Sequence, residues 1–223
     1  MRANDSTRKL TLAAMFAALA FIVTVALPHI HLVAAAPFLS YDTKDVILAI
    51  CGFTLGPVPA LTVTAVVSLL EMLTVSGTGP IGCVMNLLSS AAFALPAAIL
   101  YKRRRTLNSA GAGLALSVAV AVVTMLLWNY FITPLYMGVP RETVAAMLLP
   151  AFLPFNLIKA ALNAALTMLI YKPVSRALKM SGLIASGGDA VSVDKVHSLR
   201  ANLIAALVLA AAAIAALVMS GTI

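Results

Sequence analysis

Seven apolar runs, separated by glycine, proline or charged residues, constrain the fold of this chain more than any other feature. A transmembrane helix needs about 20 predominantly apolar residues, so these runs occupy nearly all of the 223 residues. Hydrophobic residues make up 62% of the chain and charged residues only 10%, whereas soluble domains carry roughly 25% charged residues. The sequence therefore predicts an all-α integral membrane protein. The runs are at about 10–27, 44–56, 58–75, 83–101, 110–132, 150–171 and 203–219.

Residues that break helices, found between the apolar runs, predict where one helix ends and the next begins. Gly56-Pro57 separates the short second helix from the third, and the glycine-rich stretch from Gly77 to Gly82 separates the third from the fourth. We predict a six-helix membrane domain over residues 1–175, a polar linker over 176–200 and an additional C-terminal transmembrane helix over 201–223. The first run begins after Arg8-Lys9, as a signal peptide would, but lacks a convincing cleavage site, so we expect it to remain as helix 1.

The basic residues orient the predicted bundle. Twelve of the fifteen fall before the first helix, between the fourth and fifth, and after the sixth. Alternating spans bring these positions to one side, which the positive-inside rule makes cytoplasmic, together with the N-terminus and the linker. The run Lys102–Arg105 then marks topology, and no nucleic-acid partner is expected. The twelve are Arg2, Arg8, Lys9, Lys102, Arg103, Arg104, Arg105, Lys172, Arg176, Lys179, Lys195 and Arg200.

A polar stripe lies inside the sixth apolar run. Spacings of three and four residues put Asn156, Lys159 and Asn163 on one helix face. An ionisable group at membrane depth is costly and usually faces a cavity, a partner or a substrate. The inner half of the predicted bundle has almost no such groups, which favours an outward-facing binding pocket over a channel. Other polar side chains expected in the outer half are Asn86, Asn129 and Glu71.

Structural alternatives stay open for these residues. Lys159 could form an ion pair with Glu71 that ties the third helix to the sixth, and asparagines also hydrogen-bond between membrane helices. Asp42 and Asp45 are expected to cap the second helix, where acids favour the helix dipole, and a ligand role for Asp42 is the less favoured interpretation. Aromatic residues near the outer boundary are typical of an interfacial belt, although one or two could stack on a flat ligand. They are Phe38, Tyr41, Trp128, Tyr130 and Tyr136.

Other features narrow the class of protein. Small residues four apart allow close helix approach, so Ala14 and Ala18 could form a docking face, with internal packing as the alternative. The chain contains no GxxxxGK[ST], HExxH or GxSxG motif, so neither ATP hydrolysis nor another enzymatic activity is expected. Cys51 and Cys83 lie in apolar stretches without clustered ligands, so we interpret them as small buried hydrophobes and expect no metal.

Several segments resemble the riboflavin-specific substrate-binding (S) subunit of energy-coupling factor (ECF) transporters. The resemblance spans roughly residues 8–175. Its more specific pieces are Asn-Tyr-Phe…Pro-Leu-Tyr within 128–138 and Pro-Phe-Asn-x-Ile-Lys at 154–159, and Gly52–Pro57 and Gly79–Gly82 are generic to such subunits. It implies a six-helix S-component bundle in a bacterial cell membrane, with a transmembrane coupling subunit and two cytoplasmic ATPases as partners.

The resemblance also implies roles for individual residues. Asn129, Asn156 and Lys159 resemble residues that hydrogen-bond the isoalloxazine ring of riboflavin, whose pyrimidine edge offers both acceptors and a donor. Residues of the outer loop and of the following Gly-rich region would take the ribityl chain: Leu39, Tyr41, Thr43, Gly79 and Asn86. Glu71 departs from what a flavin site requires, but could neutralise Lys159 or accept from a ribityl hydroxyl. Ala14 and Ala18 resemble the docking surface for the coupling subunit.

The expected function is thus capture of riboflavin, or of FMN or an analogue, from outside the cell for ATP-driven import. Riboflavin would be the transported ligand, and no cofactor is expected. Two alternatives remain: an S component for another vitamin or heterocycle, because a fold does not fix a substrate, and a membrane scaffold in which the Asn and Lys groups only lock helices together.

Overall fold

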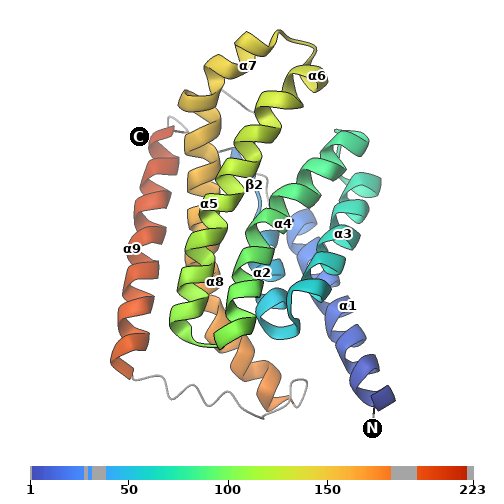
Figure 1. Ribbon diagram of the computed structural model, residues 1–223, viewed down its shortest axis with the longest axis vertical. Helices are drawn as coiled ribbons and strands as arrows, with labels where there is room; N and C mark the ends of the chain where they lie inside the picture. Colours follow the sequence, from blue (N-terminus) through green and yellow to red (C-terminus); the bar gives the residue numbers. More distant parts are fainter. Residues whose placement is uncertain (1, 28–29, 32–38, 182–194, 220–223) are drawn as a thin grey trace.

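The computed structural model describes residues 2–27, 30–31, 39–181 and 195–219, and these are almost entirely helical (Figure 1). Ile30–His31 (β1) and Ser40–Tyr41 (β2) form a short antiparallel pair in which Ile30 lies opposite Tyr41. The helical segments are α1 (Arg2–Ala26), α2 (Lys44–Leu55), α3 (Pro57–Thr74), α4 (Gly79–Arg104), α5 (Leu107–Phe131), α6 (Thr133–Met137), α7 (Arg141–Met147), the π-helical η1 (Leu148–Phe152), α8 (Leu153–Met180) and α9 (Lys195–Met219).

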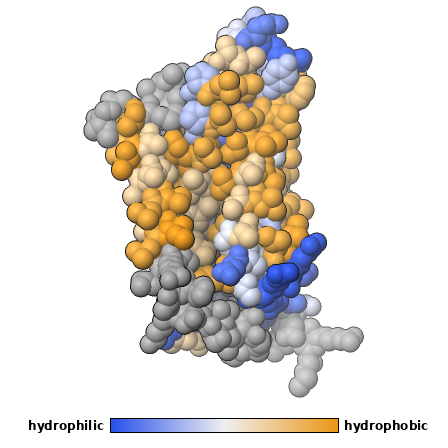
Figure 2. All heavy atoms as spheres, turned by 60° about the vertical axis from the view of Figure 1, so that its left-hand side comes forward, coloured by the Kyte–Doolittle hydropathy of each residue, from blue (hydrophilic) through white to orange (hydrophobic). Residues whose placement is uncertain are grey.

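Five helical stretches of the described chain are long and apolar enough to cross a membrane: Ser6–Ala26, Pro57–Thr74, Gly79–Arg104, Leu107–Phe131 and Arg141–Leu178. The apolar part of α9, Asn202–Val218, is shorter. Figure 2 shows apolar atoms along the side of the molecule between hydrophilic atoms near its two ends. The predicted all-α membrane fold is confirmed.

Successive helices alternate in direction when the short α2 is counted with the long ones: α1, α3, α5 and α9 run upward in Figure 1, and α2, α4 and α8 run downward. The start of α1, the connection from α4 to α5, the end of α8 and the start of α9 all lie at the lower end in that view. The basic groups that were predicted to share one side therefore do share one end of the bundle. α6 and α7 lie at the other end.

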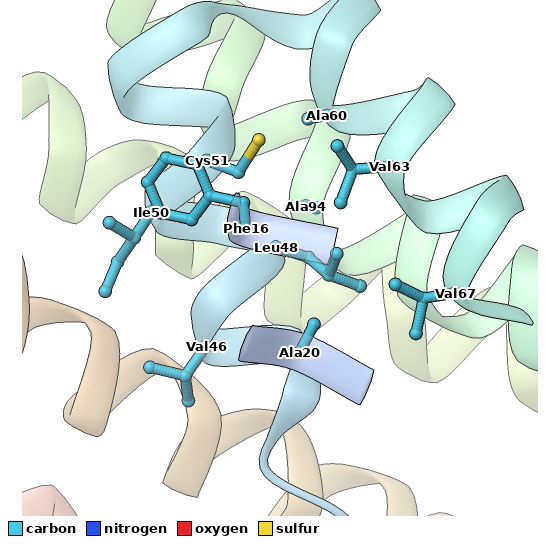
Figure 3. Close-up of a cluster of buried hydrophobic side chains, with 10 residues drawn as sticks. All are labelled: Phe16, Ala20, Val46, Leu48, Ile50, Cys51, Ala60, Val63, Val67 and Ala94. Carbon is cyan, nitrogen blue, oxygen red and sulfur yellow. The ribbon is translucent and has the colours of Figure 1, made fainter. Parts of the chain in front are cut away.

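The short α2 forms the centre of the core. It measures about 18 Å at 1.5 Å per residue, too short to cross a membrane, and nine of its 12 residues are buried. Phe16 of α1, Val63 of α3 and Ala94 of α4 surround it (Figure 3). A Cβ on Gly52 would come within 2.7 Å of the Ala98 Cβ, so glycine permits the close approach of α2 to α4. Burial within this cluster confirms the interpretation of Cys51 as a small hydrophobe.

Two predicted boundaries were wrong because prolines were tolerated. The expected loop at Gly79–Gly82 is the first turn of α4, where Pro80 lacks only an N–H that the helix does not need. The helix expected from about 150 begins nine residues earlier as α7 and continues through η1 into α8. Pro150 marks the expected start, and it has no N–H to donate to a carbonyl of the preceding turn, yet it lies within η1. A π-type turn, in which the Leu153 N–H bonds to the Leu148 carbonyl, accommodates this region.

The predicted division at residues 175 and 200 stays a prediction. α8 runs past the first boundary to Met180, and residues 182–194 lie outside the described residues. α9 packs along α8, and its Ala212 and Ala216 join a buried cluster with Tyr41, Phe155 and other residues.

Candidate functional site

The polar stripe of α8 faces the chain segment that leads into α2. Lys159 Nζ lies 3.0 Å from Asp42 Oδ2, and each of the two side chains is about 15% exposed. One turn further, Asn163 Nδ2 donates to Asp45 Oδ2 at 3.4 Å. The Tyr41 hydroxyl donates to Asn163 Oδ1 at 2.9 Å. The stripe therefore forms one wall of a largely buried polar network.

The phenol of Tyr41 can act as a stable donor in this network. Burial raises its pKa above the ordinary value, and the negative charges of Asp42 and Asp45 raise it further. Because the phenol stays protonated, its bond to Asn163 fixes the orientation of that amide. Tyr41 is buried, so the interfacial-belt interpretation was wrong for this residue.

A second ion pair lies on the other side of the network. Lys44 Nζ is 2.6 Å from Glu71 Oε2, and the two side chains are only 3% and 2% exposed. Asn86 Nδ2 donates to the same oxygen at 2.9 Å. The alternative in which Lys159 pairs with Glu71 was therefore wrong. Lys44 is the first residue of the buried helix α2 and pairs with Glu71, whereas Lys159 pairs with Asp42.

The expected capping role was wrong for Asp42, whereas Asp45 does lie in the first turn of α2, where an acid favours the helix dipole, although it makes no capping bond. The residue at the N-cap of α2 is Thr43, without a side-chain capping bond. Asp42 bonds to Lys159, and Asp45 Oδ1 accepts from Ser90 Oγ at 2.5 Å. The sequence feature that could have predicted these pairs is the group of three charged residues at 42, 44 and 45, where the apolar second helix begins. Such a cluster, if buried, requires partners on other helices.

Three buried oxygens of this region have no hydrogen-bond partner among the described residues: Thr43 Oγ1, Ser68 Oγ and Glu71 Oε1. Buried polar atoms are nearly always hydrogen-bonded, so each of these needs an explanation. Two are hydroxyls that can donate and accept, and the third is a carboxylate acceptor. Together they offer bonding capacity to a polar molecule.

A cavity of about 230 Å³ lies beside α6, at the end of the bundle that the positive-inside rule predicts to face outward. Asn129 lines it, and the aromatic rings of Trp128 and Tyr136 are part of the same wall. The Asn129 amide is turned to its own helix: Nδ2 donates to the Met125 carbonyl at 2.7 Å, and Oδ1 accepts from Thr133 Oγ1 at 2.9 Å. The complete lining is Leu39, Thr78, Ile81, Gly82, Met85, Trp128, Asn129, Thr133, Tyr136 and Met137.

The remaining predicted residues are placed separately. Asn156 is buried and donates to the Phe152 carbonyl at 2.7 Å, at the end of the π-helical segment. Gly79 has a φ of +59°, which favours glycine, but it does not line the cavity. Phe38 lies outside the described residues.

The structure thus gathers the predicted residues into two neighbouring groups. Leu39 and Asn129 line the cavity, while Tyr41, Glu71, Asn86 and Lys159 belong to the network. Leu39 joins the two groups, because it also packs against the cluster that contains Tyr41. No group of three or more His, Cys, Asp or Glu side chains suited to a metal ion occurs in the described residues.

The predicted docking residues lie elsewhere. Ala14 and Ala18 are exposed on α1, while Phe16 and Ala20 of the same helix are buried in the core. The two alanines lie on the exposed side of α1, where larger side chains are also exposed: Leu10, Met15 and Leu19. Internal packing of Ala14 and Ala18 is therefore excluded.

Three comparisons agree on the family. Residues 8–171 match the family model of the ECF transporter, substrate-specific component. The riboflavin transporter RibU of Staphylococcus aureus (strain TCH60) is 30% identical over 182 residues, which cover 78% of this chain and 94% of that protein. The solved structure of the S component of a bacterial ECF transporter is similar with a TM-score of 0.66 and 30% identity, covering 78% of this chain and 99% of the other. The predicted family is confirmed: the chain belongs to the substrate-specific S components of ECF transporters.

Proposed function

We propose that this S component captures riboflavin at the outer face of a bacterial cell membrane. The ligand would be delivered inward with the help of a transmembrane coupling subunit and two cytoplasmic ATPases. The observation that carries the substrate is the likeness to a riboflavin transporter over 78% of the chain. The N-terminus and the basic end of the bundle would face the cytoplasm, by the positive-inside rule.

Side-chain chemistry supports a flavin. The amides of Asn129 and Asn156 and the ammonium of Lys159 match a heterocyclic edge that alternates carbonyl acceptors with an N–H donor. Trp128 and Tyr136 present aromatic surface to the same cavity as Asn129, and such rings stack on flat ligands.

The unsatisfied oxygens support a polyol chain beside the ring. Thr43 Oγ1, Ser68 Oγ and Glu71 Oε1 are buried without partners among the described residues. A ribityl chain carries hydroxyls that donate and accept, so it would satisfy all three. Glu71 then has two roles, since its other oxygen already accepts from Lys44 and Asn86.

Binding requires side-chain rearrangement. The cavity of about 230 Å³ is below the range of about 300–1,000 Å³ that is typical of small-molecule sites. Asn129 and Asn156 must also release bonds to the carbonyls of their own helices. Each exchange costs little, because a net hydrogen bond contributes about 1 kcal/mol.

The direct test is a titration of riboflavin with the protein purified in detergent, followed by quenching of flavin fluorescence. We expect quenching, and a visible flavin band in protein purified from riboflavin-containing medium. Asn129→Ala and Asn156→Ala should each weaken binding about threefold to tenfold, the effect of one lost neutral hydrogen bond. Asn108→Ala is the matched control, because this amide is exposed at the opposite end of α5.

A colourless protein that also leaves riboflavin fluorescence unchanged would rule out the flavin. The family assignment would remain, and other vitamins would be screened on the same site. That second candidate is favoured by the fold alone, which does not fix a substrate.

Docking of the coupling subunit gives a separate expectation. Because Ala14 and Ala18 are exposed, replacing both with leucine should block close helix approach and abolish riboflavin uptake by cells. Riboflavin binding by the purified variant should not change. Ala65→Leu, at an exposed position of α3, is the control and should leave both measurements unaltered. Normal uptake by the double variant would place the docking surface elsewhere.

A further inference from the structure

A second hollow, of about 650 Å³, lies between α5, α8 and α9, away from the site described above. Its walls include Gly111 and Ala115 of α5, Ala164 and Met168 of α8, and Ile204 of α9. Part of α9 is needed to form it, and α9 lies beyond the residues 8–171 that match the family model. The hollow is therefore not explained by the function proposed for the family.

The hollow is an apolar groove that opens to the membrane. Asn108 is the single polar residue of its lining, and Ala115, Ile204 and Val208 are exposed. A Cβ on Gly111 would meet only the Met168 Cε, at 3.9 Å, so the space beside this glycine is open. Since the α5 and α8 walls lie within apolar spans, the groove faces hydrocarbon rather than water.

One end of the groove is strongly basic. The exposed Lys102, Arg103 and Arg104 form the last turn of α4, and the groove begins two residues after Arg105, at Leu107. Lys172 follows Met168 by four residues and so lies on the same face of α8. Figure 2, which brings the side with α9 forward, shows hydrophilic atoms near the lower end of this apolar surface.

The same end carries the N-terminus of α5. The helix dipole is positive there, and anions are favoured at such positions. Asn108, in the first turn of α5, adds an exposed amide donor beside the groove. Basic pockets between transmembrane helices on the cytoplasmic side bind anionic lipid headgroups. Acyl-chain space and anion-binding groups therefore adjoin each other.

We propose that this groove binds one anionic phospholipid. One of its two acyl chains lies between α5, α8 and α9, and its phosphate lies at the basic connection between α4 and α5. The charges select an anionic headgroup over a zwitterionic one. The lipid fills the space between α9 and the helices α5 and α8, which lie largely within the residues that match the family model.

The test is native mass spectrometry of the full chain released from detergent micelles. Dioleoylphosphatidylglycerol or dioleoylphosphatidylcholine is added at matched concentrations. We expect one phosphatidylglycerol to be retained per protein, at lower lipid concentrations than phosphatidylcholine. Arg103→Gln and Arg104→Gln should each weaken phosphatidylglycerol binding about fivefold, because a basic side chain near an anionic headgroup contributes about that factor.

Two variants fill the groove itself. Gly111→Leu directs a side chain at Met168, because beyond α5 itself the only atom of the described residues within 4 Å of the added Cβ is Met168 Cε. Ala115→Leu enlarges another side chain of the groove lining, one turn later on α5. Both should reduce phosphatidylglycerol retention to the level of phosphatidylcholine. Ala65→Leu, exposed on α3, is the control and should retain the lipid. Circular dichroism and a monodisperse elution profile check that each variant is folded, and either groove variant alone suffices for the test.

Two results would overturn the proposal. Equal retention of the two lipids, or unchanged retention in the folded groove variants, would show that no selective lipid site exists here. A dimer mass that disappears in Gly111→Leu would instead show that a second copy of the chain covers the groove.

Discussion

Lys159→Met should strongly weaken riboflavin binding, whereas Asp42→Asn should preserve it. In the structure the ammonium of Lys159 bonds to Asp42, so the carboxylate holds the group that we assign to the isoalloxazine ring. A hydrogen bond to a charged group contributes about 1.5–3 kcal/mol, so loss of the lysine should weaken binding on the order of 10- to 100-fold. Asp42→Asn removes the competing charge and should leave the affinity equal or tighter. Fluorescence quenching of riboflavin measures both.

The two variants discriminate a ligand group from a structural ion pair. If Lys159 and Asp42 only hold α8 to the start of α2, the two single variants should lose binding and stability together. The double variant Lys159→Met/Asp42→Asn is the control: it should recover stability, because no unpaired charge remains, but not riboflavin binding. Recovery of binding in the double variant would contradict the role of Lys159 as a ligand group.

The largest effect on stability is expected at the other ion pair. Lys44→Met leaves Glu71 charged and buried, and Glu71→Gln does the same to Lys44; both side chains are at most 3% exposed. Removing one partner of a buried pair costs about 3–5 kcal/mol. Each single variant should therefore lower the free energy of unfolding by this amount, as measured by denaturation in mixed detergent–lipid micelles.

The double variant Lys44→Met/Glu71→Gln should recover most of that loss, because no buried charge is left alone and the glutamine can still accept from Asn86. Lys9→Met is the control at an exposed position and should change the free energy by less than about 0.5 kcal/mol. A Lys44→Met variant as stable as the original chain would show that water reaches Glu71.

The sequence predicted the membrane fold because apolar runs of bilayer length have few other solutions. Two of its errors at the helix ends have one cause, the helix-compatible prolines. Pro80 lies in the first turn of α4, and Pro150 lies within the π-helical segment η1. Neither can be told from a helix breaker by residue type alone.

The candidate site was predicted in part. The 3.6-residue period placed Lys159 and Asn163 on one face, and the structure confirms that this face meets polar partners. The hydrogen-bond partners of Lys159 and Asn163 were not predictable, because they depend on how deeply the start of α2 is buried in the bundle. Asp42, Lys44 and Asp45 look like surface charges in the sequence, and only the burial of α2 turns them inward.

α9 determines at which end of the bundle the described chain ends. Its start lies at the same end as the N-terminus and its end lies at the opposite one (Figure 1). If α9 crosses the membrane, as we predict from the sequence, it separates the start of α1 from the end of α9, whereas a six-helix core would keep both ends on one side. In the proposed orientation, a reporter fused after α9 would then lie on the outer face, where we propose that riboflavin binds. The cytoplasmic face, where we propose that the coupling subunit and the ATPases bind, would then carry no reporter.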